Sequence, residues 1–167
     1  MLDPAAKRQI NCGRLSTPAI YGKYPGSENG DWKDTAPQPG RAVKDCFFND
    51  SNAFLVEHLD SNFTIICRDD SLDQAEKDKL AAHGIKILEI DPNRSSEFIT
   101  LYELTARSFY LVGPDQYILG RWKNFTPQDA ITLMNRYLSG EVFPHGDLQK
   151  TAQELVDQQV YAMIMKG

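Results

Sequence analysis

The sequence predicts an α/β domain with a central mixed β-sheet flanked by helices. Two observations support this class. Short β-rich runs alternate with amphipathic stretches between residues 50 and 140, and a turn signal at residues 113–116 separates two apolar runs that follow each other directly. The chain has 167 residues, of which 41% are apolar and 25% are charged, an ordinary composition for one globular domain with extensions.

The first half of the predicted sheet is a strand–helix–strand unit. Residues 63–67 form a continuous apolar run typical of a buried strand. Ser71 and Gln74 have the spacing of a capping box, so a helix is expected to begin there and to end before Gly84. Residues 85–90 predict the next strand. Such a unit is expected to be parallel and right-handed.

Three further helices are expected, at residues 51–59, 95–107 and 126–139. Thr126 is suited to cap the last of them, and Pro127 is suited to its first helical position. Four apolar residues are predicted to line its buried face, and a glycine to end it: Ala130, Met134, Tyr137 and Leu138, followed by Gly140.

A β-hairpin is predicted between the last two helices. It joins residues 109–112 to residues 117–119, with Pro114 at position i+1 of a type I turn and Asp115 at i+2. An antiparallel hairpin added to a parallel unit makes the sheet mixed. The complete order, β-α-β-α-β-β-α, is that of a thioredoxin-like domain.

The chain is expected to divide into three parts. Residues 1–45 are rich in Pro, Gly, Asn and Ser and lack a regular period, so they predict an irregular extension. This extension either wraps over the surface or belongs to a neighbouring domain. Residues 46–140 predict the thioredoxin-like domain. Residues 141–167 predict a tail with an amphipathic helix over residues 147–165, which either packs on the core or docks on a partner.

Charge and cysteine content exclude several classes of protein. A formal net charge of -5 disfavours a nucleic-acid-binding protein. No apolar run approaches the roughly 20 residues that span a bilayer, and the N-terminus lacks the apolar region of a secretory signal. Cys12, Cys46 and Cys67 are odd in number and widely spaced, as expected for reduced thiols in a cytoplasmic protein.

The position of a thioredoxin redox motif, directly after the first strand of the unit, reads Cys67-Arg68-Asp69-Asp70. An active protein places Cys-x-x-Cys there, where a helix N-terminus lowers the thiol pKa. Here Asp70 occupies the position of the second cysteine, and the two carboxylates disfavour a thiolate. We therefore expect Cys67 to be a small buried residue. The alternative is a small redox protein that uses Cys67 alone.

No catalytic, cofactor-binding or metal-binding residue is expected. The three histidines, His58, His83 and His145, lack partners at ligand spacing. The sequence contains no nucleophile elbow, P-loop or dinucleotide-binding glycine motif. Tyr117 and Trp122 could stack on a small molecule, which leaves a binding module as another alternative. Such aromatics more often anchor a core or an interface.

Three short segments, in order along the chain, match motifs of one family. Residues 9–21 read QINCGRLSTPAIY, residues 39–45 read PGRAVKD, and residues 111–120 read LVGPDQYILG. They resemble the segment that leaves the substrate domain, the Pro-Gly-x-Arg-Ala-Pro-Asp motif and the Leu-Val-Arg-Pro-Asp-x-Tyr-x-x-Gly hairpin of FAD-dependent aromatic-ring hydroxylases. This family includes 3-(3-hydroxyphenyl)propionate hydroxylase and phenol hydroxylase-like monooxygenases. Val43 replaces the proline of the second motif, and Gly113 replaces the arginine of the third.

The resemblance implies a C-terminal, thioredoxin-like domain that has lost its redox motif. Whole enzymes of this family bind FAD and NAD(P)H and hydroxylate phenolic substrates with O2, and their flavin-binding motifs lie in an upstream domain. This chain contains none of those motifs, so no cofactor is expected within it. The implied function is a non-catalytic structural or dimerisation module, in contact with a second copy or with a flavin-domain partner.

Overall fold

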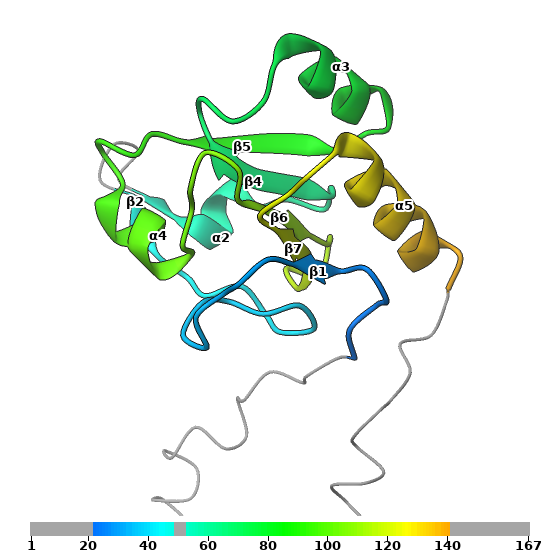
Figure 1. Ribbon diagram of the computed structural model, residues 1–167, viewed down its shortest axis with the longest axis horizontal. Coiled ribbons are helices and arrows are strands. Elements are labelled where there is room, and N and C mark those ends of the chain that lie inside the picture. Colours follow the sequence, from blue (N-terminus) through cyan, green and yellow to red (C-terminus); the bar gives the residue numbers. More distant parts are fainter. Residues whose placement is uncertain (1–21, 49–52, 141–167) are drawn as a thin grey trace, which may run out of the picture.

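The computed structural model describes residues 22–48 and 53–140, and within them it forms a mixed α/β domain (Figure 1). The central sheet has the strand order β1-β7-β6-β4-β5, with the bounds Glu28–Asn29 (β1), Thr64–Arg68 (β4), Lys86–Ile90 (β5), Phe109–Val112 (β6) and Ile118–Trp122 (β7). β4 pairs with β5 in parallel, whereas β6 is antiparallel to both β4 and β7. The predicted mixed sheet is therefore confirmed.

Helices cover both faces of this sheet (Figure 1). α3 (Gln74–Ala82) and α5 (Pro127–Leu138) lie on one face. α2 (Leu55–His58) and α4 (Ser96–Leu101) lie on the other, together with a two-stranded ribbon of β2 (Phe47–Phe48) and β3 (Ala53–Phe54). None of the helices in the described part of the chain has the length and apolar character needed to cross a lipid bilayer.

Each face has its own hydrophobic cluster because side chains alternate along the strands. In β4, Ile65 and Cys67 face the cluster beneath α3 and α5, whereas Ile66 faces the cluster beneath α2 and α4. The second cluster is rich in aromatic rings: Tyr102 stacks on Phe98 with ring centroids 4.2 Å apart. A sheet buried on both faces explains why its strands read as nearly continuous apolar runs.

The α3 helix begins two residues later than predicted. Its N-cap is Asp73, whose carboxylate accepts the Glu76 N–H at 2.8 Å, while the Glu76 carboxylate accepts the Asp73 N–H at 3.1 Å. Ser71 is not the cap: within the described residues its buried hydroxyl has no hydrogen-bond partner, and its N–H closes a turn onto Arg68 O at 3.1 Å. Gly84 follows the helix with φ of 72°, as predicted.

The helix predicted over residues 95–107 is shorter, because α4 (Ser96–Leu101) ends in a Schellman motif. Glu103 has φ of 49°, and the N–H of Leu104 donates to Ile99 O at 3.0 Å. A glutamate rather than a glycine occupies the left-handed position, so no glycine marks the end of this helix in the sequence. The helix predicted over residues 51–59 is likewise limited to α2, within the described residues.

The hairpin turn is confirmed, and its second strand is longer than predicted. The N–H of Gln116 donates to Gly113 O at 3.0 Å, which closes the turn, and Gln116 then has φ of 63°. This is the three-residue hairpin loop in which a left-handed residue follows a type I turn. β7 continues to Trp122 rather than ending at residue 119, with a register shift opposite residues Leu111 and Val112.

The α5 helix begins as predicted, and three of the four residues predicted for its buried face pack on the core. Thr126 and Asp129 form its capping box, and Pro127 is its first residue. Ala130 and Met134 are buried as predicted, and Tyr137 packs edge-to-face on Phe63 with ring centroids 5.5 Å apart. Leu138 does not contribute to the buried face, because it is 64% exposed. The buried residues of the helix are Pro127, Ala130, Ile131, Leu133 and Met134.

Residues 22–45 wrap over the domain, the first of the two arrangements left open by the sequence. They are not wholly irregular, since β1 pairs in parallel with the end of β7. Farther along, Ile118 O accepts the Gly40 N–H at 2.8 Å, and Gln116 O accepts the Val43 N–H at 2.9 Å. The extension therefore covers the outer edge of β7 along most of its length.

Several expectations concern residues outside the described part of the chain. These are the family-like segment 9–21 with Cys12, and the predicted tail helix 147–165 with His145, which precedes it.

Candidate functional site

Cys67 lies at the carboxyl end of β4, where a thioredoxin-like redox protein would hold its reactive thiols. Its side chain is 0% exposed and belongs to the cluster beneath α3 and α5. Cys46, the other cysteine in the described ranges, packs against the cluster on the opposite face of the sheet. The two thiols are therefore separated by the sheet and do not form a pair.

Burial raises the pKa of the Cys67 thiol to about 12, and nearby carboxylates add to this effect. The strongest of these carboxylates is Glu89, which lies opposite Cys67 on β5 and forms an ion pair with Lys77 at 2.7 Å. Asp69 and Asp70, the two acids named from the sequence, contribute less. The register of β5 against β4 would have identified Glu89, because residues paired in a parallel sheet share a face.

Asp70, expected from the sequence at the position of a second redox cysteine, forms an ion pair with Arg68. Its carboxylate accepts Nε of Arg68 at 3.1 Å and Nη2 at 2.8 Å, and the aspartate side chain is 55% exposed. The following turn is fixed by a hydrogen bond from Asp69 N–H to Ile90 O at 3.2 Å. The strand end is thus a hydrogen-bonded turn closed by a surface ion pair.

No cluster of three His, Cys, Asp or Glu side chains in the described part of the chain has the geometry of a metal site. His58 packs its ring edge-on against Phe48, with centroids 5.1 Å apart. The Nδ1 of His83 lies 2.9 Å from Lys79 O at the end of α3. Both contacts are those of structural side chains.

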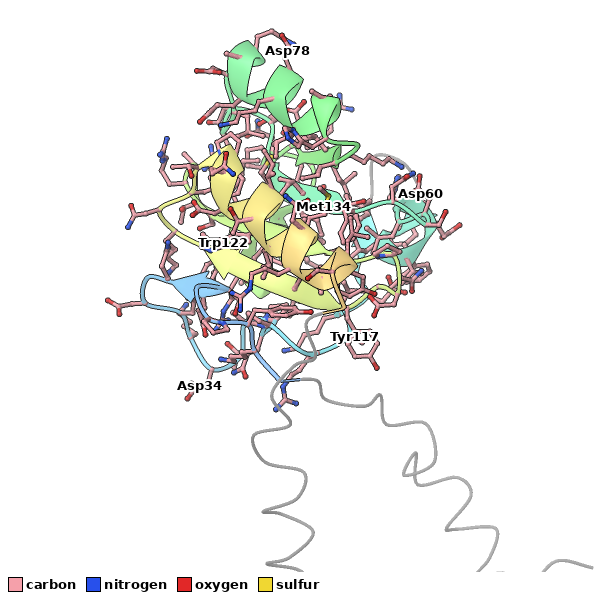
Figure 2. The ribbon with its side chains drawn as sticks, turned by 90° about the vertical axis from the view of Figure 1, so that its right-hand side faces the viewer. Asp34, Asp60, Asp78, Tyr117, Trp122 and Met134 are labelled. Carbon is pink, nitrogen blue, oxygen red and sulfur yellow. The ribbon has the colours of Figure 1, made fainter. Side chains whose placement is uncertain are left out.

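Tyr117 and Trp122 lie at opposite ends of β7 and do not form a joint binding surface (Figure 2). Trp122 is 1% exposed beneath α5, and its indole N–H donates to Gly26 O at 3.0 Å. The ring lies against Gly120, where an added Cβ would be 2.6 Å from Trp122 Cζ2. Trp122 is a core residue and is not accessible to a ligand.

An ion pair at the edge of the sheet was not predicted from the sequence. Arg121 on β7 is 4% exposed; its Nε donates to Glu28 Oε1 at 2.6 Å, and its Nη1 donates to Pro37 O at 2.9 Å. Partial burial acts to raise the pKa of Glu28, but hydrogen bonds from Lys23 and Arg121 hold that pKa below its ordinary value. The signal was an arginine within an apolar strand, missed because the strand was expected to end at residue 119.

Trp32 of the extension completes this cluster. The Arg121 guanidinium lies 4.9 Å from the centroid of the Trp32 ring, and the Lys123 ammonium lies 4.7 Å from it. The indole N–H donates to Asn29 O at 2.8 Å, and the ring meets Tyr110 edge-on. Because the donors of Arg121 are used by carbonyl and carboxylate groups of the extension, the cluster is built to hold two segments together.

Three surface depressions in the described part of the chain hold about 80, 170 and 230 Å³. Sites for small molecules typically hold roughly 300–1,000 Å³. None of the three is lined by Cys67, Tyr117 or Trp122. Of the residues singled out from the sequence, His58 lines the smallest depression, which is well below the volume of a small-molecule site.

No protein family model matches the sequence, and no curated protein matches it. Solved structures do share the fold. RebC-10x soaked with chromopyrrolic acid and containing 7-carboxy-K252c matches with a TM-score of 0.55 at 15% identity, over 77% of this chain and 24% of that one. The rebeccamycin biosynthetic enzyme RebC matches over the same shares at 16% identity, with TM-scores of 0.54 without substrate and 0.52 with reduced flavin.

These matches concern the fold. The chain spans 24% of the length of the RebC chains and has the fold of that part of them. The resemblance to part of a flavin-dependent enzyme, predicted from three short motifs, is confirmed at this level.

Proposed function

We propose that this chain is a non-catalytic, thioredoxin-like module that acts through contacts with other protein, as part of a flavin-dependent aromatic hydroxylase or as a relative of that part. The observation that carries the proposal is the state of Cys67, a buried thiol with a pKa of about 12 at the position of a redox pair. A thiolate is the reactive form of cysteine. At neutral pH its fraction would be on the order of 10⁻⁵.

The connectivity of the sheet supports the thioredoxin-like assignment. The parallel β4–α3–β5 unit is followed by α4, by the antiparallel hairpin β6–β7 and by α5. In this proposal residues 46–140 form the domain, residues 22–45 complete its edge, and residues 141–167 form a separate tail. The partner is a second copy or a flavin domain, in the reducing cytoplasm.

The test is a measurement of Cys67 reactivity in the full chain. Replacing Cys12 and Cys46 by serine leaves Cys67 as the only thiol. We expect alkylation at pH 7 to be slow in the native protein and to become fast in urea, because unfolding exposes the thiol. The unsubstituted chain is the control, since its half-buried Cys46 should react without denaturant. Rapid native alkylation of Cys67, or reduction of a disulfide substrate that depends on it, would overturn the proposal.

A separate measurement addresses the contact role. Light scattering during size-exclusion chromatography of the full chain gives its mass, alone and mixed with the product of a neighbouring gene where that gene encodes a flavin-binding protein. A dimer, or a complex with that protein, supports a contact module. A monomer that forms no such complex contradicts it.

A further inference from the structure

The ribbon of β2 and β3 presents an exposed aromatic pair. Phe47 and Phe54 lie opposite each other in the antiparallel register, with ring centroids 5.2 Å apart in an edge-to-face contact. They remain 37% and 47% exposed, whereas the neighbouring Phe48 is 4% exposed and faces the core. Phe48 anchors the ribbon on the core, so the opposite face carries the exposed aromatic pair. A paired apolar surface of this kind is suited to receive another segment.

Carboxylates surround this aromatic pair, and they are on the surface. Asp45 accepts the N–H of Val56 at 3.2 Å, and Glu57 accepts the N–H of Phe54 at 2.8 Å, so both lie at the ribbon. Glu97 on α4 is close enough to raise the pKa of Cys46, together with Asp45 and with burial as the main cause. All three carboxylates belong to exposed residues. The patch is thus apolar at its centre and negative at its rim.

We propose that residues 1–21 of the chain dock on the Phe47–Phe54 patch. This segment carries three basic residues, Lys7, Arg8 and Arg14, against one acidic residue, Asp3. The remainder of the chain therefore has a net charge of -7, because the total is -5 and the segment contributes +2. Guanidinium groups are attracted both to carboxylates and to the faces of aromatic rings, so an Arg-containing segment fits both parts of the patch.

Charge favours this occupant over a second copy of the ribbon, and the segment is long. Nine residues lie between Cys12 and Gly22, and the ten Cα–Cα steps that join them can span up to roughly 35 Å, about the diameter of a domain of this size. A symmetric contact between two ribbons would instead bring the same carboxylate rim against itself, which is unfavourable. The proposal goes beyond the proposed function and does not depend on it.

Cys12 and Cys46 provide the test in the unmodified chain. Cys46 is half-buried beside Phe47, and Cys67 is fully buried, so a short bismaleimide is expected to bridge Cys12 and Cys46 within one chain. We expect the yield of the Cys12–Cys46 cross-link to fall roughly fivefold in the variant Arg8→Glu/Arg14→Glu. A change of this size corresponds to the loss of ordinary surface ion pairs. The charge-matched control Lys79→Glu/Arg107→Glu, which changes exposed cations elsewhere, should keep the yield.

Two further measurements complete the test. The variant Phe47→Ser/Phe54→Ser should lower the yield without changing net charge, and raising salt from about 0.05 M to about 0.5 M should lower it by screening. If the Phe variant does not fold, the Arg variant and the salt series still test whether residues 1–21 dock on the patch. Absence of an intrachain bridge, a yield insensitive to Arg8 and Arg14, or a bridge between two chains would overturn the proposal.

Discussion

Arg121 on β7, a buried residue, and the half-buried Glu28 on β1 form an ion pair that joins the sheet to the N-terminal extension. Only 5% of the Arg121 side chain is exposed, and its Nε lies 2.6 Å from Glu28 Oε1 across 93 positions of sequence. The same guanidinium binds Pro37 O and lies over Trp32, so it contacts three parts of the extension. One strand side chain therefore organises a segment that has little regular structure of its own.

Replacing Arg121 by alanine is expected to lower the free energy of unfolding by about 3 kcal/mol, since it leaves the carbonyl groups of Ala36 and Pro37 without their donor and removes the packing of the guanidinium on Trp32. Urea unfolding followed by circular dichroism measures this change. The control is Arg107→Ala, at an exposed residue, which should change stability by less than about 0.5 kcal/mol. Equal effects of the two substitutions would show that these contacts of Arg121 do not stabilise the fold.

The contribution of Glu28 should depend on pH. Its folded-state pKa lies below the ordinary value, so its stabilising effect is present above the unfolded pKa, about 4.3. This effect is lost as the pH falls through the lower folded pKa. We expect Glu28→Gln to be less stable than the unsubstituted chain at pH 7 and the difference to shrink at pH 3. If the stability difference between the two proteins grew as the pH fell, the lowered folded-state pKa of Glu28 would be contradicted.

Gly120 should not tolerate a side chain. A Cβ there would lie 2.6 Å from Trp122 Cζ2 and 2.8 Å from Leu133 Cδ2, both in the packed core. Gly120→Ala is expected to cost about 1–3 kcal/mol and to alter Trp fluorescence. Gly113→Ala is the matched control, because its Cβ would meet the flexible Asp115 carboxylate and the cost should be below about 1 kcal/mol. Equal costs would argue against close packing at Gly120.

Val43 should not be replaceable by the proline of the related motif without loss. Its N–H donates to Gln116 O at 2.9 Å, and proline has no such donor. Val43→Pro is expected to cost about 1 kcal/mol more than Val43→Ala, which removes two methyl groups but keeps the N–H. Thermal unfolding of the three proteins measures the difference. A Pro variant at least as stable as the Ala variant would mean that this hydrogen bond contributes nothing.

The sequence predicted the regular part of the fold because that part is coded locally. The strand at residues 63–67, the turn at Pro114 and the capping of α5 each depend on neighbouring residues. The end of α4 was missed because Glu103 adopts a conformation that usually requires glycine. Its carboxylate accepts the N–H of Lys33, a contact across 70 positions that local patterns do not contain.

The sequence predicted that the Cys67 thiol would be hard to ionise, but it did not predict the main cause. Cys67 was expected to be buried and hard to ionise, and it is. The main cause is burial, and the strongest charge is Glu89, which approaches through strand pairing. The Arg121–Glu28 pair was missed because the strand was expected to end before Arg121 and because its partner strand lies in a segment with no periodicity. Long-range pairing carries this information, and one sequence does not reveal it.

The same long-range contacts predict where the folding unit begins. A chain that starts at residue 46 would expose the outer edge of β7 and would remove Gly26 and Glu28, the partners of Trp122 and Arg121. An exposed strand edge beside unpaired buried donors favours aggregation. We expect residues 22–140 to give a cooperative unfolding transition and residues 46–140 to give an aggregated or unfolded product. Circular dichroism and light scattering of the two fragments measure this, and a stable, monomeric 46–140 fragment would show that the extension is dispensable.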